Sequence, residues 1–173
     1  MDLKPYIRDV PDFPKKGIVF KDITTLLLRP EVVHEAVRQI SERYRREGVR
    51  KVACIEARGF VLGSLIAQEL NAGFVPIRKK GKLPAKTRRE EYSLEYGTDT
   101  IEIHEDAIAS GDRVLMHDDL LATGGTMSAA IKLVQKLGGK IVGASFLIEL
   151  AFLRGRQLLL PVESLALITY DHE

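Results

Sequence analysis

Two stretches of the chain repeat the same order, in which an apolar run, a helical pattern and a second apolar run follow one another. The first stretch covers residues 51–55, 59–70 and 73–78, and the second covers residues 113–117, 126–137 and 140–150. Parallel strands cannot be joined by a tight turn, and a helix usually makes the crossover between them. The sequence therefore predicts an α/β fold with a central, mainly parallel sheet that is flanked by helices on both faces.

The remaining segments are expected to complete one continuous domain over residues 1–173. Residues 31–47 carry an apolar stripe at helical spacing, and residues 165–169 are typical of a last strand. Prolines and Gly17 interrupt residues 1–30, which predicts a lightly structured N-terminal hood around a short apolar element at residues 18–20.

A different pattern separates the two units. Residues 79–89 are basic and carry a glycine and a proline, which is typical of a loop. Residues 92–96 and 98–104 are expected to pair as a hairpin around Gly97, because apolar residues alternate along the second of them.

Composition and charge exclude several classes of protein. The 173 residues include 26 basic and 24 acidic side chains, and this balance argues against nucleic-acid binding, which needs an uncompensated basic face. Cys54 is the single cysteine, which excludes an intramolecular disulfide, and its apolar neighbours favour a buried packing thiol. No stretch resembles a signal peptide or a bilayer span, so we expect a cytoplasmic protein.

A glycine-bearing polar segment follows the strand that is predicted at residues 113–117. Its central residues are Ala122, Thr123, Gly124, Gly125 and Thr126. The glycines allow backbone amides to converge on an anion, and the helix that begins here adds a favourable dipole. Because ligands of open parallel sheets bind at the carboxyl ends of the strands, the segment predicts a site for a phosphate monoester.

Asp118 and Asp119 need a separate explanation, because carboxylates repel phosphate. Next to a phosphate site they are suited to accept hydrogen bonds from ribose hydroxyls, or to stabilise positive charge that builds on the sugar. The structural alternative is a polar strand end with a glycine-rich turn, but the full combination of residue types favours function. His117 directly precedes them, and we expect a partly buried, hydrogen-bonded histidine there.

Residues 114–126 resemble the signature of the type I phosphoribosyltransferases. Four further segments, residues 13–23, 56–60, 78–84 and 92–97, are similar to the adenine-specific members of that family in the same order. The resemblance covers nearly the whole chain and implies the type I phosphoribosyltransferase fold, with a mobile catalytic loop and hairpin over residues 79–97. It also implies a homodimer of purine salvage that converts adenine and 5-phosphoribosyl 1-pyrophosphate to AMP and pyrophosphate.

The pyrophosphate of such a donor needs a binding site of its own. Arg58 directly follows the first predicted core strand, beside Gly59, and its planar guanidinium can pair with phosphate oxygens. In similar enzymes this turn holds pyrophosphate, often with an unusual backbone conformation. The resemblance assigns Lys79 and Lys82 to pyrophosphate as well, and it places Arg78 near a dimer interface. A solvated run of charge is the structural alternative for the lysines.

Residues 83–91 carry many charges and little to bury, and we expect them to form a lid. Closing a lid would exclude water from a reactive sugar cation. The alternative is an ordinary flexible surface loop.

The resemblance places adenine at Val19, Phe20 and Lys21, with Phe20 stacked on the purine and backbone groups reading its edge. Many relatives have arginine in place of Lys21, a change that main-chain recognition would survive. The candidate catalytic residues are Arg58 and Glu95, with Glu95 transferring a proton at the purine imidazole unless it is only a polar residue of the hairpin. Mg²⁺ would be held mainly by the donor pyrophosphate and by water.

Two other functions fit part of the sequence. A phosphoribosyltransferase for xanthine, guanine or orotate would share the donor site, but residues 19–20 and the Glu95 segment argue against it. A non-catalytic regulator that senses phosphoribosyl pyrophosphate would be expected to carry an added nucleic-acid-binding domain or to lack the catalytic loop.

Overall fold

A seven-stranded sheet forms the centre of the protein in a computed structural model that describes residues 1–93 and 97–172. The order across the sheet is β5-β6-β4-β3-β7-β8-β9. The strands are β3 (Lys51–Ile55), β4 (Gly73–Lys79), β5 (Thr87–Ser93), β6 (Thr98–His104), β7 (Arg113–Leu121), β8 (Lys140–Leu150) and β9 (Ser164–Tyr170). The five strands from β4 to β9 are parallel to their neighbours, and the β5–β6 hairpin joins β4 in antiparallel orientation.

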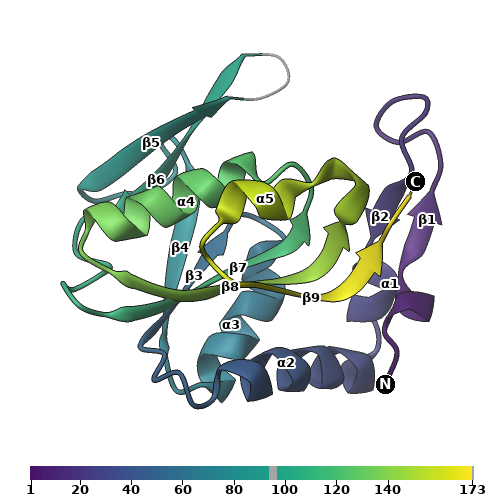
Figure 1. The fold of residues 1–173 in the computed structure, drawn as a ribbon, viewed down its shortest axis with the longest axis horizontal. Helices are drawn as coiled ribbons and strands as arrows, with labels where there is room; N and C mark the ends of the chain where they lie inside the picture. Colours follow the sequence, from purple (N-terminus) through teal and green to yellow (C-terminus); the bar gives the residue numbers. More distant parts are fainter. Residues whose placement is uncertain (94–96, 173) are drawn as a thin grey trace.

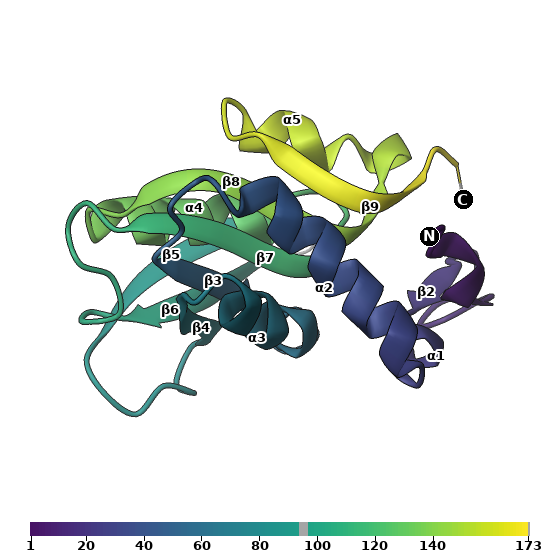
Figure 2. The same cartoon turned by 90° about the horizontal axis from the view of Figure 1, so that it is seen from below.

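Helices cover both faces of this sheet, as Figures 1 and 2 show. On one face lie α4 (Gly125–Lys136) and the short α5 (Gly155–Leu159), and on the other lie α2 (Pro30–Tyr44) and α3 (Gly59–Glu69). Each pair packs on its own cluster of buried apolar side chains, so the sheet separates two hydrophobic cores. This arrangement confirms the predicted α/β architecture.

A second, two-stranded sheet forms the N-terminal hood. In it β1 (Arg8–Val10) pairs antiparallel with β2 (Phe20–Asp22), preceded by the 3₁₀ turn η1 (Lys4–Tyr6) and followed by α1 (Thr24–Leu27). The hood lies beside the carboxyl end of β9, where Figure 1 also places the C-terminus. Residues 1–30 are therefore more regular than their prolines and Gly17 predicted, because the pairing of β1 with β2 joins segments ten residues apart.

Two predicted boundaries near the carboxyl edge of the sheet were wrong by several residues. The strand that was predicted to end at His117 continues through both aspartates to Leu121, because its partner β8 continues alongside it as far as Leu150. The basic loop predicted over residues 79–89 is shorter, because β5 begins at Thr87 and pairs with β6 from Thr87↔His104 to Ser93↔Thr98. Among the described residues, no helix is long and apolar enough to cross a membrane.

Candidate functional site

A cavity of about 200 Å³ opens at the carboxyl ends of β3, β4 and β7. Residues from all three strand ends line it, together with the first turn of α4. The predicted site residues among them are Arg58, Lys79, Asp118, Asp119 and Thr126. The structure thus brings residues that are far apart in the sequence to one edge of the sheet, where the parallel fold predicted a ligand.

The two aspartates lie where β7 extends beyond its neighbour. The pairing of β3 with β7 ends at Cys54↔His117, so Asp118 and Asp119 are bounded by β8 on one side and the cavity on the other. Asp119 is buried and Asp118 is half-buried. Burial raises the pKa of both carboxyls, and the negative charge of Asp119 raises that of Asp118 further. The pair is therefore a concentrated site of negative charge that favours positively charged or hydrogen-bond-donating ligands.

Arg58 faces this pair from the start of α3. Its Nε lies 3.0 Å from Oδ2 of Asp119, and its positive charge opposes the rise in the pKa of that carboxyl. The approach depends on Gly59, because a Cβ there would lie 2.8 Å from Oδ1 of Asp118. A side chain at position 59 would therefore push the start of α3 away from the aspartates.

The predicted phosphate loop connects β7 to α4. Gly124 has a φ of +83° and precedes the helix, which begins at Gly125, one residue earlier than predicted. Among the described residues no side chain caps this helix start by a hydrogen bond, so its first amides remain available to an anion. Thr126 lines the cavity from the first turn, which places the helix start next to Asp118 and Asp119.

Glu56 organises the opposite end of the cavity, a role that sequence reasoning missed. Its carboxylate accepts a hydrogen bond of 2.8 Å from Nε of Arg78 and one of 2.7 Å from the amide of Lys79, and it lies 3.4 Å from Nζ of Lys82. Burial acts to raise the pKa of Glu56, but these donors hold it below its ordinary value. The peptide bond between Glu56 and Ala57 is cis.

The predicted basic residues are only partly brought together. Arg58 and Lys79 line the cavity, whereas Lys82 is outside its lining and contacts it through Glu56. Nζ of Lys79 lies 3.0 Å from Oδ2 of Asp99, a partner on β6 that the sequence did not suggest. The one signal that could have found Glu56 is its position, since it directly follows a buried strand.

The hood contributes the predicted base-binding residues. The ring centroid of Phe20 lies 5.1 Å from the guanidinium carbon of Arg58, and the ring of Phe13 meets it edge-on at 5.2 Å. The hood and the cavity are therefore in direct contact through Phe20. Val19 is half-buried beside it. The side chain of Lys21 is buried, and the residues that line the cavity do not include it among those described.

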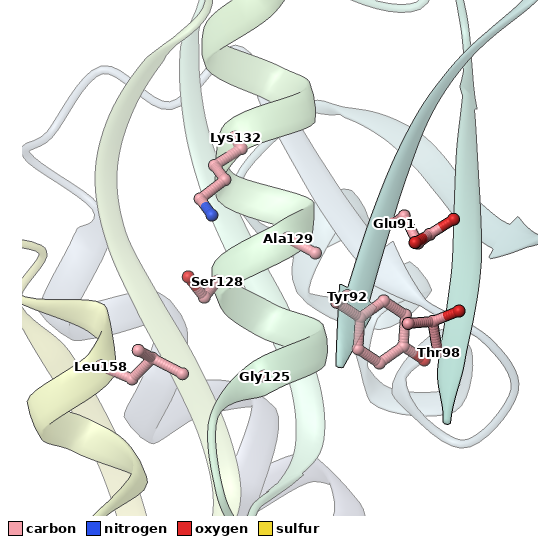
Figure 3. Close-up of a pocket in the computed structure, with 8 residues that line it drawn as sticks. All are labelled: Glu91, Tyr92, Thr98, Gly125, Ser128, Ala129, Lys132 and Leu158. Atoms are coloured by element: carbon pink, nitrogen blue, oxygen red, sulfur yellow. The ribbon is translucent and has the colours of Figure 1, made fainter. Parts of the chain in front are cut away.

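Glu95, the candidate for proton transfer, lies outside the described residues. The described part of the hairpin ends at the pair Ser93↔Thr98. A second cavity of about 300 Å³ lies between this hairpin and α4. Figure 3 shows Tyr92 and Thr98 on the hairpin, and Gly125 and Ser128 on α4. Tyr92 lines both cavities, so it forms part of the wall between them.

His117 is more deeply buried than predicted. It is fully buried, its Nδ1 lies 3.0 Å from Oγ of Ser145, and burial lowers its pKa to about 4. The residue is therefore neutral near pH 7 and belongs to the packing beneath the aspartates. Cys54 is buried as expected, and burial raises the pKa of its thiol.

Comparison with known proteins identifies the family. Residues 22–166 match the phosphoribosyl transferase domain model. The chain is 57% identical over 157 residues to the adenine phosphoribosyltransferase of Natranaerobius thermophilus, an overlap of 91% of this chain and 92% of the relative. The chain belongs to the adenine phosphoribosyltransferases.

Solved structures of such phosphoribosyltransferases share the fold. The adenine phosphoribosyltransferase of Rhodothermus marinus superposes with a TM-score of 0.93 at 54% identity, covering 97% of this chain and 96% of that one. The enzyme of Saccharomyces cerevisiae, complexed with D-2,5-dideoxy-2,5-imino-altritol 1,6-bisphosphate and adenine, superposes with a TM-score of 0.90 at 35% identity, covering 95% and 96%. Family and fold are therefore supported by sequence and by structure.

Proposed function

We propose that this phosphoribosyltransferase transfers the ribose 5-phosphate group of 5-phosphoribosyl 1-pyrophosphate to adenine, producing AMP and pyrophosphate for purine salvage. The observation that carries the proposal is the cavity in which adjacent aspartates separate a phosphate loop from a cluster of cations. A ligand with phosphate groups at its two ends and a sugar between them matches that order of charge. The relative from Saccharomyces cerevisiae was solved with a bisphosphate and adenine, which supports a site for these two kinds of ligand.

The donor lies in the cavity in a single orientation. Its 5-phosphate is bound by the loop and the start of α4, through residues Ala122, Thr123, Gly124, Gly125 and Thr126. Asp118 and Asp119 accept hydrogen bonds from the ribose hydroxyls and stabilise positive charge on the sugar. Arg58, Lys79 and Lys82 bind the pyrophosphate, and Glu56 holds the lysine-bearing turn in place.

Adenine binds between the hood and the cavity. Phe20 stacks on the purine, and backbone groups of Val19 and Lys21 read its edge. The bond from the anomeric carbon to pyrophosphate breaks as the bond to the purine nitrogen forms, and Arg58 neutralises charge on the departing group. Glu95 takes the proton that the purine nitrogen loses. An unchanged kcat in Glu95→Gln would contradict that role.

Mg²⁺ is proposed to enter with the donor. Among the described residues, no group of three or more histidine, cysteine or acidic side chains is placed to hold a metal ion, whereas Asp118 and Asp119 border the cavity. Asp118 and Asp119 would suit an ion that is held mainly by pyrophosphate oxygens and water. When bound, the ion would shield the charge of the pyrophosphate.

The working form is proposed to be a homodimer of this single domain. Apolar side chains of α3 and β4 remain exposed, namely Val61 (42%), Leu65 (38%) and Phe74 (38%). Such an apolar face is suited to pack against a second copy of the chain. A monomeric mass in sedimentation equilibrium at assay concentration would contradict this.

A base-panel assay tests the activity. The purified protein is incubated with phosphoribosyl pyrophosphate, Mg²⁺ and one of adenine, guanine, hypoxanthine, xanthine or orotate, and the nucleotide formed is measured. We expect kcat/KM for adenine to exceed that for every other base by at least about 100-fold, because a site that hydrogen-bonds one base edge leaves polar groups unpaired with another. A higher kcat/KM for guanine or orotate would overturn the adenine assignment.

A further inference from the structure

Gly155, which begins α5, packs directly against the backbone of the phosphate loop. A Cβ at Gly155 would lie 2.1 Å from the carbonyl oxygen of Ala122 and 2.9 Å from the carbonyl carbon of Thr123. The contact is reciprocal, because a Cβ at Gly124 would lie 2.6 Å from the carbonyl oxygen of Gly155. These neighbours are backbone atoms, which cannot rotate aside as the end of a side chain can. Two glycines thus allow two distant segments of backbone to touch.

The segment that carries Gly155 is itself firmly held. Nε of Arg156 donates a hydrogen bond of 3.1 Å to Oε1 of Glu149, and its other nitrogens donate to Oε2 of Glu149 and to the carbonyl oxygen of Ser164. Glu149 is buried, and it pairs with Leu121, the residue that immediately precedes the phosphate loop. The start of α5 is therefore fixed to the same strand ends from which the loop emerges.

We infer that Gly155 is a positioning residue for the phosphate loop. Its backbone forms the rear support of residues 122–124, and the Arg156–Glu149 ion pair keeps that support at a constant distance. Gly155 does not touch the substrate in this arrangement. It acts by keeping the loop amides directed into the cavity, where a displacement of about 1 Å is enough to lower activity by about 100-fold. The inference rests on the proposed role of the loop in binding the 5-phosphate.

The test compares the binding of two ligand fragments by titration calorimetry. Ribose 5-phosphate probes the loop, and pyrophosphate probes the cations at the other end of the cavity. In Gly155→Ala we expect the Kd for ribose 5-phosphate to rise by about tenfold or more, while the Kd for pyrophosphate stays within about twofold of the unsubstituted protein. Equal Kd values for ribose 5-phosphate in the two proteins would overturn the inference, and so would equal losses for both fragments.

Gly143→Ala is the matched control. A Cβ at Gly143 would lie 2.7 Å from Cε1 of Tyr44, a clash with a buried side chain in the core between β8 and α2 rather than with the backbone of the phosphate loop. We expect this variant to lose thermal stability without a change in either Kd. A rise in the Kd for ribose 5-phosphate as large as that in Gly155→Ala would show that general loss of packing explains the effect.

Arg156→Met keeps the inference testable if Gly155→Ala does not fold. This change loosens the start of α5 without adding a clash, and we expect a smaller rise, about threefold, in the Kd for ribose 5-phosphate alone. An unchanged Kd would contradict the inference. Because the fragments bind without turnover, a protein that binds ribose 5-phosphate but makes no AMP would refute the proposed function and leave this inference intact.

Discussion

At the scale of single residues, Asp118 has a proposed role in the site and a cost to stability. Its carboxyl is half-buried next to Asp119, and burial together with that second charge raises its pKa. The proton is held more tightly in the folded protein than in the unfolded chain. The contribution of Asp118 to stability is therefore complete below the ordinary aspartate pKa and is lost as the pH rises through the folded pKa.

Asp118→Asn is predicted to stabilise the protein and to inactivate it. Asparagine resembles the protonated carboxyl in shape and stays neutral, so the melting temperature should rise at neutral pH, by about 3 °C, and the gain should shrink toward pH 4. The rate of AMP formation should fall by about 100-fold or more. Thermal melts across pH and a parallel activity assay measure both. A lower melting temperature at neutral pH would show that the charge is not a burden on the fold.

At the scale of elements, the hood is attached to the end of β9 by cations. Nζ of Lys21 lies 2.9 Å from Oδ1 of Asp9 and 4.2 Å from the ring centroid of Tyr170, and Nζ of Lys4 lies 4.5 Å from the same ring. The two contacts with Tyr170 hold the hood against the larger sheet, and the contact with Asp9 joins β2, which carries Phe20, to β1. The side chain of Lys21 thus has a structural task, and its backbone is the part that is proposed to bind the base.

Lys21→Met should weaken adenine binding selectively. The change keeps the length of the side chain but removes the charge from Asp9 and from Tyr170, a loss of about 1 kcal/mol that corresponds to about fivefold. We expect the KM for adenine to rise by about that factor, with the KM for the donor unchanged. Lys21→Arg is the control that keeps both contacts and should behave as the original protein. Equal changes in the two KM values would contradict the model of a hood that serves the base alone.

The elements also show what the sequence could and could not predict. Apolar runs gave β3 and β8 with correct bounds, because these strands are buried on both faces. They did not predict that β7 continues through Asp118 and Asp119, because that extension depends on the length of β8 rather than on local apolar content. Pairing between β1 and β2 was missed for the same reason, since it depends on a partner and not on the segment alone.

At the scale of the whole molecule, the site is assembled from strand ends and from the start of α5, which no sequence motif marked. The aspartates, the loop and Arg58 were found because each combines unusual residue types at a strand end. Gly155 escaped notice because a lone glycine carries no signal until its neighbours in space are known, and Glu56 was marked only by its position directly after a buried strand. The residues that are proposed to bind the donor were therefore easier to recognise in the sequence than the residues that hold them in place.

The most direct test of the account measures AMP and pyrophosphate formed from adenine and phosphoribosyl pyrophosphate with Mg²⁺. The unsubstituted protein is compared with the double variant Asp118→Ala, Asp119→Ala. The account predicts one pyrophosphate for each AMP in the first protein, and a rate at least about 1,000-fold lower in the second. Near-normal AMP formation by the double variant would contradict it.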